Sequence, residues 1–407
     1  MKTTPFLSLP LLVSLAAFAG PVTTVPWNGH TGAVSLTYDD ARTSQIPNLL
    51  PQLDALKIKA TFFIAVTGTD GDFEAKKAAW IQAAQNGHEL ANHTKAHVNV
   101  PADPAAAPIV VEMAKYLRDL DPSVESVSFA YPNCNVNGKT GIASEDFIAR
   151  GCGQTSYAWA TQPSDWMNIQ GLILGPTNVA TATGMFTAAK SANTWVVTIV
   201  HDVKESPDQY SMTPADNKKM LDAAVESKLW IDTYQNVAAY YRAHFVMDAA
   251  TTSLTDAGWA MSWTSPHPKM PKSVKLRVKL AEATFGKSFT VQQSGTTIAP
   301  ESDGSYAIDF MKLSLKVIQG TTGIKSRTIL PAKVTARATK DGIVFSGGSG
   351  DGYATVTDVR GATLFRGRVS DRLIPLRMEG LHGLLFLDLS DPDSRASVRA
   401  VVNAMPY

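Results

Sequence analysis

Residues 33–40 read AVSLTYDD, and this stretch decides the fold. Its apolar and β-branched residues are typical of a buried strand, and two aspartates end the run. Leucine and isoleucine then recur at helical spacing from Ile46 to Leu56, and residues 60–65, ATFFIA, form a second apolar run. The order strand, helix, strand predicts two parallel strands joined by a crossover helix.

The same alternation continues to about residue 247. Further strands are predicted near residues 88–92, 127–131, 195–200 and 229–233. Helices are predicted before Gly87 and near residues 106–119, 143–150, 213–226 and 234–244. This repetition predicts an α/β fold with a parallel sheet, and a (β/α) barrel is one closed form of such a sheet.

The pattern changes after about residue 250. Short strand-like runs separated by glycine, serine and aspartate occur at residues 273–280, 289–293, 306–310, 313–318, 353–359, 362–368 and 384–389. We interpret them as one or two small β-sandwich-like modules, with glycine-rich stretches at 320–326 and 347–352. The expected organisation is a signal peptide at 1–19, an α/β domain at 20–250, a β-rich accessory domain at 251–320, and a linker with a C-terminal β-rich module at 321–407.

The N-terminus has the pattern of an export signal. Lys2 precedes a mostly apolar run from Phe6 to Phe18, and Ala17-Phe18-Ala19 places small residues where signal peptidase cleaves. A membrane anchor is the alternative, but the run is short for the roughly 30 Å of hydrocarbon in a bilayer. The sequence therefore predicts a protein that is secreted to the extracellular space or the cell envelope, without a stable membrane span.

The charge balance argues against nucleic acid as a partner. The chain has 37 Lys and Arg against 36 Asp and Glu, a formal net charge of +1. Neutralising phosphates requires clustered basic charge, so a neutral or weakly charged ligand fits this chain better. The sequence gives no indication of the oligomeric state.

The chain contains two cysteines, Cys134 and Cys152. In an oxidising compartment they could form one disulfide that closes a short loop, worth about 3 kcal/mol by the loop-entropy argument. Two free thiols are the alternative, which export makes the weaker one. Because no Cys-x-x-Cys spacing is present, a structural zinc site built from thiolates is excluded.

Two carboxylates end the first predicted strand. Asp39 and Asp40 lie at the carboxyl end of a parallel strand, where α/β folds assemble their sites. Neighbouring residues of an extended chain point in different directions, so one carboxylate can bind a metal while the other reaches a bound water. A strand-ending turn with two solvated acids is the alternative.

A pair of histidines follows a later strand. His93 and His97 are four residues apart, so they can face the same way and bind one cation together. With Asp40 they provide one carboxylate and two imidazoles, a set that leaves coordination positions open for water and substrate. His30 and His88 compete as ligands, but neither has a partner at a suitable spacing.

A further histidine, His201, ends the apolar run of residues 195–200. This position places its imidazole at the same end of the sheet as Asp39, although a boundary histidine without a chemical role is the alternative. Asp165 is its predicted partner, since a carboxylate would raise the proton affinity of the imidazole and fix its tautomer.

In this order the motifs resemble those of the polysaccharide deacetylases, carbohydrate esterase family four, which contain the NodB homology domain. The series is TYDD at 37–40, HTKAH at 93–97, FAYP at 129–132 and the strand-end His201. The resemblance covers about residues 30–245, and residues 229–240 look like the end of such a domain. It implies a distorted (β/α) barrel, with residues 20–250 as the catalytic domain.

The resemblance also implies a role for each matched residue. Asp39 is the general base, His201 is the general acid, and a divalent metal is held by Asp40, His93 and His97. Zinc is the expected metal, with cobalt, nickel and manganese as alternatives.

The resemblance further implies what surrounds the acetyl group. A backbone N–H near Asn133, beside Tyr131, would complete the pocket for the oxyanion. The implied partner is an acetylated polysaccharide or oligosaccharide: N-acetyl amino sugars of chitin or peptidoglycan, or O-acetyl groups of xylan.

The third motif departs from the family. It usually reads Arg-x-Pro-Tyr, whereas residues 130–133 are AYPN. The arginine that normally orients the base is absent, and so is the tyrosine after the proline. Arg42, two residues beyond Asp40, is the candidate replacement, and a bridge from Cys134 to Cys152 is expected to brace the loop.

Two functions follow from these observations. The first is a hydrolase that acts on non-peptide C–N bonds or on acetyl xylan esters. The alternative is a catalytically weak carbohydrate-binding protein that retains the fold, which the missing arginine favours. The β-rich tail is interpreted as a stability or spacer module rather than a polysaccharide-binding or sorting-type domain, and Trp259 and Trp263 as packing rather than sugar-stacking residues.

Overall fold

The computed structural model describes residues 21–255, 258–286, 288–319, 335–339, 341–346, 352–359, 361–369, 373–377, 383–390 and 397–404. The chain divides into two compact units, Met1–Ala281 with Thr290–Ile318 and Glu282–Phe289 with Gln319–Tyr407. The predicted signal peptide at 1–19, the glycine-rich stretch at 320–326 and residues 347–351 lie outside the described residues. The domain boundaries predicted at 250 and 320 stay predictions.

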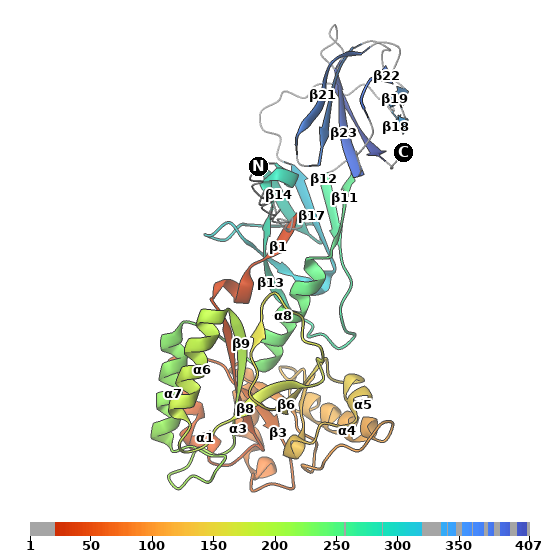
Figure 1. Cartoon of the computed structure of the whole chain (residues 1–407). Coiled ribbons are helices and arrows are strands. Elements are labelled where there is room, and N and C mark those ends of the chain that lie inside the picture. The colour runs from red at the N-terminus through yellow and green to blue at the C-terminus, as the bar shows by residue number, and fades with distance from the viewer. Residues whose placement is uncertain are drawn as a thin grey trace, which may run out of the picture. The chain divides into compact units, whose positions relative to one another are not determined.

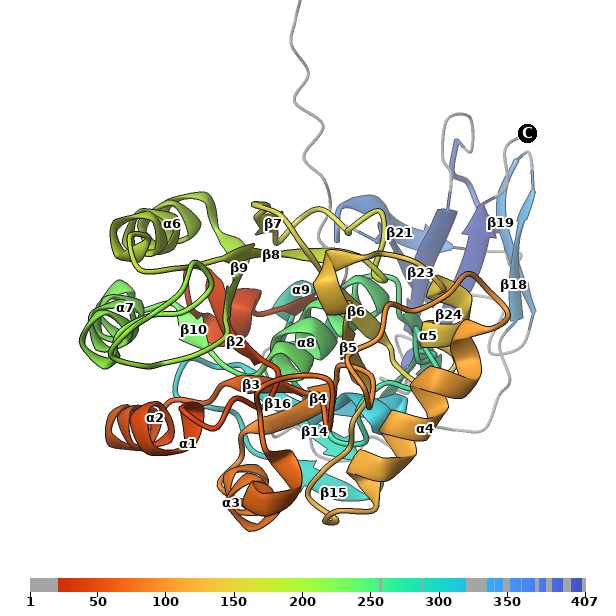
Figure 2. The same cartoon turned by 90° about the horizontal axis from the view of Figure 1, so that it is seen from below.

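Within residues 21–255, seven parallel strands close into a barrel (Figures 1 and 2). Around the ring they are β2 (Ala33–Asp39), β3 (Thr61–Ile64), β4 (Glu89–Asn92), β5 (Ser128–Ala130), β6 (Ile148–Cys152), β8 (Ile169–Ile173) and β9 (Thr194–Val200). The ring closes because β9 also pairs in parallel with β2. Two short strands extend it: β10 (Trp230–Ile231) is parallel to β2, and β7 (Tyr157–Ala158) is antiparallel to β9. The predicted (β/α) barrel is confirmed.

Helices follow most of the strands, and in Figure 2 all of them but the last lie around the outside of the ring. They are α1 (Gln45–Asn48), α2 (Leu50–Leu56), α3 (Phe73–Gln85), α4 (Ala106–Arg118), α5 (Lys139–Ala143), α6 (Val179–Ala192), α7 (Pro214–Ser227) and α8 (Tyr234–Met247). Local sequence sets where α7 begins: Thr213 accepts a hydrogen bond from Asp216 N at 3.0 Å, and Pro214 occupies the first turn. The helix α8 begins against the amino ends of β3 and β4, where Gln235 N donates to Glu89 Oε2 at 2.9 Å.

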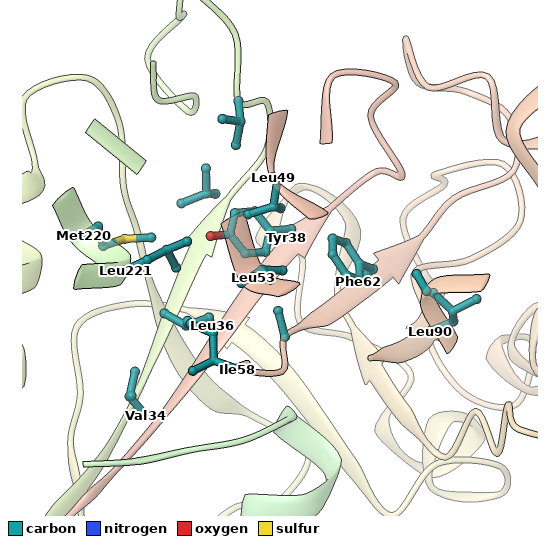
Figure 3. Packing of buried hydrophobic residues seen from close by; sticks show 14 of the residues in the cluster. Val34, Leu36, Tyr38, Leu49, Leu53, Ile58, Phe62, Leu90, Met220 and Leu221 are labelled. Carbon is teal, nitrogen blue, oxygen red and sulfur yellow. The ribbon is translucent and has the colours of Figure 1, made fainter. Parts of the chain in front are cut away.

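The main core lies between the strands and the surrounding helices. Figure 3 shows Tyr38 and Phe62 from β2 and β3 packing beside Leu49 and Leu53, with Met220 and Leu221 of α7 on another side. Each fully buried side chain of this size contributes about 1.5–3 kcal/mol through the apolar surface that it removes from water. Strands covered on both faces need apolar residues at successive positions, which explains the near-continuous apolar run of β2.

The helix predicted at 143–150 is wrong. The helix there is α5, which ends at Ala143, and Ile148–Cys152 form β6 instead. Residues 148–151 are buried between β5 and β8, so pairing on both sides overrides the helical spacing. The prediction also missed β8 and α6, because it placed no element between residues 151 and 194.

Besides the barrel, the described part of the first unit contains two antiparallel sheets. One sheet contains β1 (Val22–Thr24), β13 (Lys275–Leu280) and β16 (Tyr306–Asp309). Another contains β11 (Thr251–Thr255), β12 (Gly258–Ser262), β17 (Ser314–Gln319), β14 (Phe289–Gln293) and β15 (Thr296–Ile298). Short helices occur at η1 (Pro26–Gly29), η2 (Pro132–Cys134) and η3 (Phe310–Lys312), while α9 (Glu282–Phe285) belongs to the second unit. Trp263 is buried and donates through Nε1 to Phe310 O at 2.8 Å, so it is a packing residue.

The second unit contains two antiparallel sheets that share a small core. One has β18 (Thr335–Thr339), β19 (Gly342–Ser346) and β22 (Leu373–Ile374), and the other has β21 (Thr363–Val369), β20 (Gly352–Asp358), β23 (Gly383–Ser390) and β24 (Ser397–Ala404). Phe345 of the first sheet packs in one cluster with Val356 and Leu387 of the second. These sheets fit the predicted C-terminal β modules. In the part of the chain that the structure describes, no helix is long and apolar enough to cross a membrane.

Candidate metal and catalytic site

The three predicted metal ligands converge at the carboxyl ends of β2 and β4. One ligand atom each of Asp40, His93 and His97 lies within 4.8 Å of the others. Nε2 of His93 is 3.5 Å and Nε2 of His97 is 3.3 Å from Asp40 Oδ1. Asp40 and His97 have positive φ angles of 74° and 48°, so the chain turns sharply after each strand and directs both side chains to one point.

The two oxygens of Asp40 have different surroundings. Oδ2 accepts hydrogen bonds from Nε and Nη2 of Arg42 at 3.1 and 2.8 Å. Oδ1 is buried and has no hydrogen-bond partner among the described residues. An unpartnered buried carboxylate oxygen is costly, and a cation between it and the two imidazoles would remove that cost. The oxygen and nitrogen donors present here therefore fit a divalent metal such as zinc.

His93 is prepared to act as a neutral ligand. Its Nδ1 is 2.8 Å from Ala130 O, and a hydrogen bond donated by Nδ1–H leaves the Nε2 lone pair directed at Asp40 Oδ1. Burial lowers the pKa of His93 to about 4, against the opposing charges of Asp39 and Asp40. The imidazole is therefore uncharged near neutral pH, which is the form that binds a metal.

Asp39 forms a buried bidentate ion pair that the sequence analysis missed. Nη1 and Nη2 of Arg150 donate to Oδ1 and Oδ2 of Asp39 at 2.8 and 2.7 Å. Nη1 also donates to Thr37 Oγ1 at 3.0 Å, and the guanidinium lies 4.7 Å from the centre of the Phe63 ring. Burial by itself would raise the pKa of Asp39, but the positive charge and the hydrogen bonds of Arg150 hold that pKa well below its ordinary value.

The prediction that Arg42 replaces the missing arginine is therefore wrong. Arg42 binds the metal-ligand candidate Asp40, and its Nη1 also contacts Asp70 at 2.8 Å. The guanidinium that holds the base comes from β6 instead. A signal for it was present, because Arg150 interrupts the apolar run IARGC at 148–152, but the predicted helix concealed that strand.

His201 follows β9 and lies in the same cavity as Asp39. Its backbone N–H donates to Tyr210 O at 2.9 Å. Gln45 Nε2 donates both to His201 O at 2.6 Å and to Asp39 O at 2.8 Å. Gln45, which the sequence analysis did not single out, thus joins the ends of β2 and β9.

The predicted pairing of Asp165 with His201 is wrong. Asp165 binds Lys139 Nζ at 2.5 Å and accepts from Met167 N at 2.9 Å. Nδ1 of His201 has no hydrogen-bond partner within the described chain. Asp165 precedes the amino end of β8, whereas His201 follows the carboxyl end of β9, so the two side chains belong to opposite ends of the barrel.

A cavity of about 220 Å³ joins these groups. Its lining is Asp39, His93, His97, Tyr131, Asn133, Cys134, Arg150, Cys152, Ile173, Ile199, His201 and Tyr210. A larger cavity of about 470 Å³, beside Trp166 and Arg242, contains none of the predicted site residues. The predicted site residues therefore gather at the smaller cavity.

The predicted oxyanion residues line this cavity, but they are not equally available. Tyr131 donates through N to Arg150 O at 3.1 Å and through its hydroxyl to Met167 O at 2.8 Å. Both donors of Tyr131 are thus engaged. Asn133 has a positive φ of 53° at the turn after β5 and remains the candidate donor.

The predicted disulfide between Cys134 and Cys152 is confirmed, with Cα atoms 5.4 Å apart. It links η2, which contains Asn133, to the end of β6, which carries Arg150. Both cysteines line the cavity. The bridge therefore connects the turn that contains Asn133 to the strand that carries Arg150, the partner of Asp39.

Residues 28–146 match the family model described as polysaccharide deacetylase. This match agrees with the resemblance to the polysaccharide deacetylases that the sequence motifs indicate. The matched part includes Asp39, Asp40, His93 and His97, and it ends before Arg150 and His201.

Solved structures of deacetylases are similar to this domain. The Xyl-CE4 domain of a multidomain xylanase from the hindgut metagenome of Trinervitermes trinervoides is 18% identical, with a TM-score of 0.33, covering 50% of this chain and 88% of that one. The chitin deacetylase of Colletotrichum lindemuthianum is 14% identical, with a TM-score of 0.36, covering 53% and 89%. A family 4 acetyl xylan esterase from Clostridium thermocellum, in complex with a cobalt ion, is 19% identical, with a TM-score of 0.33, covering 50% and 89%. No curated protein sequence matches the chain.

Proposed function

We propose that the protein is a secreted, metal-dependent hydrolase that removes acetyl groups from a polysaccharide or oligosaccharide. The observation that carries the proposal is the convergence of Asp40, His93 and His97 beside the Asp39–Arg150 pair and His201. Either N-acetyl amino sugars or O-acetyl xylan can be the substrate, because amide and ester hydrolysis begin with the same attack of water on an acetyl carbonyl.

Asp40, His93 and His97 would hold the metal. A divalent cation at that place, zinc first and cobalt, nickel or manganese as alternatives, supplies Lewis acidity to the acetyl carbonyl and to the attacking water. Arg42 occupies Asp40 Oδ2, which leaves Oδ1 for the cation.

Asp39 is the proposed general base. It stays ionised because of the charges around it, and the two hydrogen bonds from Arg150 fix the plane of the carboxylate. Each carboxylate oxygen retains a further lone pair, so Asp39 can accept the proton of water while it stays paired with Arg150.

His201 is the proposed general acid, which gives its proton to the leaving nitrogen or oxygen. The backbone of His201 is held by its contacts with Tyr210 and Gln45. No carboxylate among the described residues pairs with Nδ1 of its ring. The backbone N–H of Asn133 is the proposed additional donor to the oxyanion.

The sequence argument for a catalytically weak carbohydrate-binding protein that retains the fold rested on the missing arginine. Arg150 binds Asp39 in place of the missing motif arginine, which supports the hydrolase over this alternative. For the β-rich tail we propose a spacer or stability role.

The test is acetate release by the metal-loaded protein from acetylxylan, N-acetylchitooligosaccharides and peptidoglycan. We expect release from at least one polymer, increased by zinc or cobalt and removed by a chelator. No release from any of them with either metal would overturn the proposal. Mass spectrometry of the exported protein tests secretion separately, and the expected mature chain begins at Gly20.

A further inference from the structure

Tyr210 lies at the mouth of the catalytic cavity with its ring partly open to solvent. Its side chain lines the cavity, and the residue is 44% exposed. Its ring centre is 5.4 Å from that of His201, and the two rings are tilted by 39°. The other tyrosine that lines this cavity in the described chain, Tyr131, is 1% exposed.

The loop that presents Tyr210 is held in place by several contacts. Asp208 Oδ1 accepts from Tyr210 N at 3.0 Å and from Ser211 Oγ at 2.7 Å, and Asp208 Oδ2 accepts from Lys204 Nζ at 3.0 Å. The carbonyl of Tyr210 accepts from His201 N at 2.9 Å. The ring is therefore exposed on a fixed loop beside the proposed acid.

The base of the loop is closed as well. Val203 and Met212 form a parallel bridge, and Met212 N donates to Asp202 O at 3.0 Å. Pre-organised aromatic residues bind ligands without the entropy cost of ordering a mobile loop.

The volume of the cavity limits what can enter it. At about 220 Å³ it is smaller than the roughly 300–1,000 Å³ of a typical small-molecule pocket. It can accept an acetyl group and the nearest part of one sugar, and the rest of a saccharide must lie across its mouth.

We propose that the Tyr210 ring is the platform on which the sugar that carries the leaving atom packs, which makes Tyr210 a specificity-determining residue. This rests on the proposed function, because His201 must be near the leaving nitrogen or oxygen to protonate it. The sugar bonded to that atom then lies beside His201 and so beside Tyr210. The C–H face of a pyranose ring gains an apolar partner there, and the exposed ring loses its contact with water.

The test measures saccharide binding and acetate release on the same variants. Calorimetry with metal-loaded protein gives the Kd for N-acetylchitotetraose and for acetylated xylotetraose. Acetate release from these saccharides is compared with release from vinyl acetate, an ester without a ring. The variants are Tyr210→Ala, Tyr210→Leu and Tyr210→Phe, with Tyr353→Ala as the control at a tyrosine that is 51% exposed in β20 of the second unit.

We expect Tyr210→Ala and Tyr210→Leu to weaken saccharide binding and kcat/KM about tenfold or more. Tyr210→Phe and Tyr353→Ala should stay within about twofold of the parent, and vinyl acetate hydrolysis should change in none of them. Unchanged saccharide binding in Tyr210→Ala would overturn the platform, and so would a parent that binds neither saccharide. An equal loss on vinyl acetate would also overturn it, because the ring would then act through His201.

The same data separate this inference from the proposed function. A parent that binds saccharide through Tyr210 but releases no acetate refutes the deacetylase and keeps the platform. Acetate release that is insensitive to Tyr210→Ala refutes the platform and keeps the deacetylase.

Discussion

Arg150 and Asp39 form a bidentate ion pair across the interior of the barrel, with N–O distances of 2.8 and 2.7 Å. They come from β6 and β2, which are not neighbours in the ring. Arg150 is fully buried and Asp39 is 3% exposed, so each charge depends on the other for compensation. The pair fixes the proposed base and crosses the barrel at the level of the cavity.

Replacing Arg150 should reduce activity and stability together. Arg150→Gln leaves the Asp39 carboxylate buried without its cation, and breaking a buried pair costs about 3–5 kcal/mol. Arg150→Lys keeps a charge but cannot form two parallel hydrogen bonds. We expect kcat to fall about 10- to 100-fold in Arg150→Lys with metal content unchanged, as measured by acetate release and elemental analysis. Arg118→Gln, which removes a partly exposed pair with Glu145, is the control, and equal effects of both changes would contradict this role.

Removing a proposed ligand should abolish metal retention. His93→Ala takes away the neutral nitrogen that faces Asp40 Oδ1, and we expect bound zinc after gel filtration to fall to background, as measured by mass spectrometry of the metal. His30→Ala is the matched control, because His30 is exposed and contacts Lys228 O. If His93→Ala retained as much zinc as the parent, His93 would not be a metal ligand.

The variant Asp165→Asn tests whether Asp165 acts on His201, as the sequence predicted, or pairs with Lys139, as in the structure. Because Asp165 pairs with Lys139 and not with His201, we expect kcat/KM and its pH profile to stay within about twofold of the parent. His201→Gln should lose activity about 100-fold or more, as loss of a general acid does. A large loss in Asp165→Asn, with a shifted pH profile, would restore the pairing that the sequence suggested.

Glu89 should make stability depend on pH. Burial raises the pKa of Glu89 from its ordinary 4.5 to about 7, while the side chain accepts hydrogen bonds from Ser128, Thr61 and Gln235 N. The native state therefore holds a proton that the unfolded chain has released. The stability that this proton provides is fully present below about pH 4.5 and is lost as pH rises through about 7.

The measurement is urea unfolding of the parent and Glu89→Gln at several pH values from 5 to 8. Since glutamine does not titrate, we expect the parent to lose on the order of 2 kcal/mol relative to the variant over this range. Glu112→Gln, whose side chain is 57% exposed and pairs with Lys95, is the control. Parallel stability curves for the parent and Glu89→Gln would contradict the raised pKa.

The sequence predicted the barrel and the cluster of Asp40, His93 and His97 because both depend on local order along the chain. Apolar runs alternating with helical spacing indicate parallel strands, and the polar residues after those runs meet at one end of the sheet. Asp40, His93 and His97 each follow such a run, so their convergence could be expected.

The partners of Asp39 and His201 could not be predicted in the same way. The strand that faces β2 across the barrel is determined only when the ring closes. Because β6 was not predicted as a strand, Arg150 was not expected inside the barrel. Asp165 could be recognised as a carboxylate, but its spacing did not show that it lies at the amino end of β8. Both errors concern relations between elements far apart in sequence, which spacing alone does not specify.

The most direct test of the central claim compares acetate release by the zinc-loaded parent, Asp39→Asn and Arg150→Lys on one acetylated oligosaccharide. Asp39→Asn keeps the size of the side chain but cannot accept a proton, so we expect kcat to fall about 10²- to 10⁴-fold while zinc content and Kd stay near those of the parent. The kcat of Arg150→Lys should lie between those of the parent and Asp39→Asn. Parent-like acetate release by zinc-loaded Asp39→Asn would contradict the account, because the carboxylate that Arg150 holds would then not be the base.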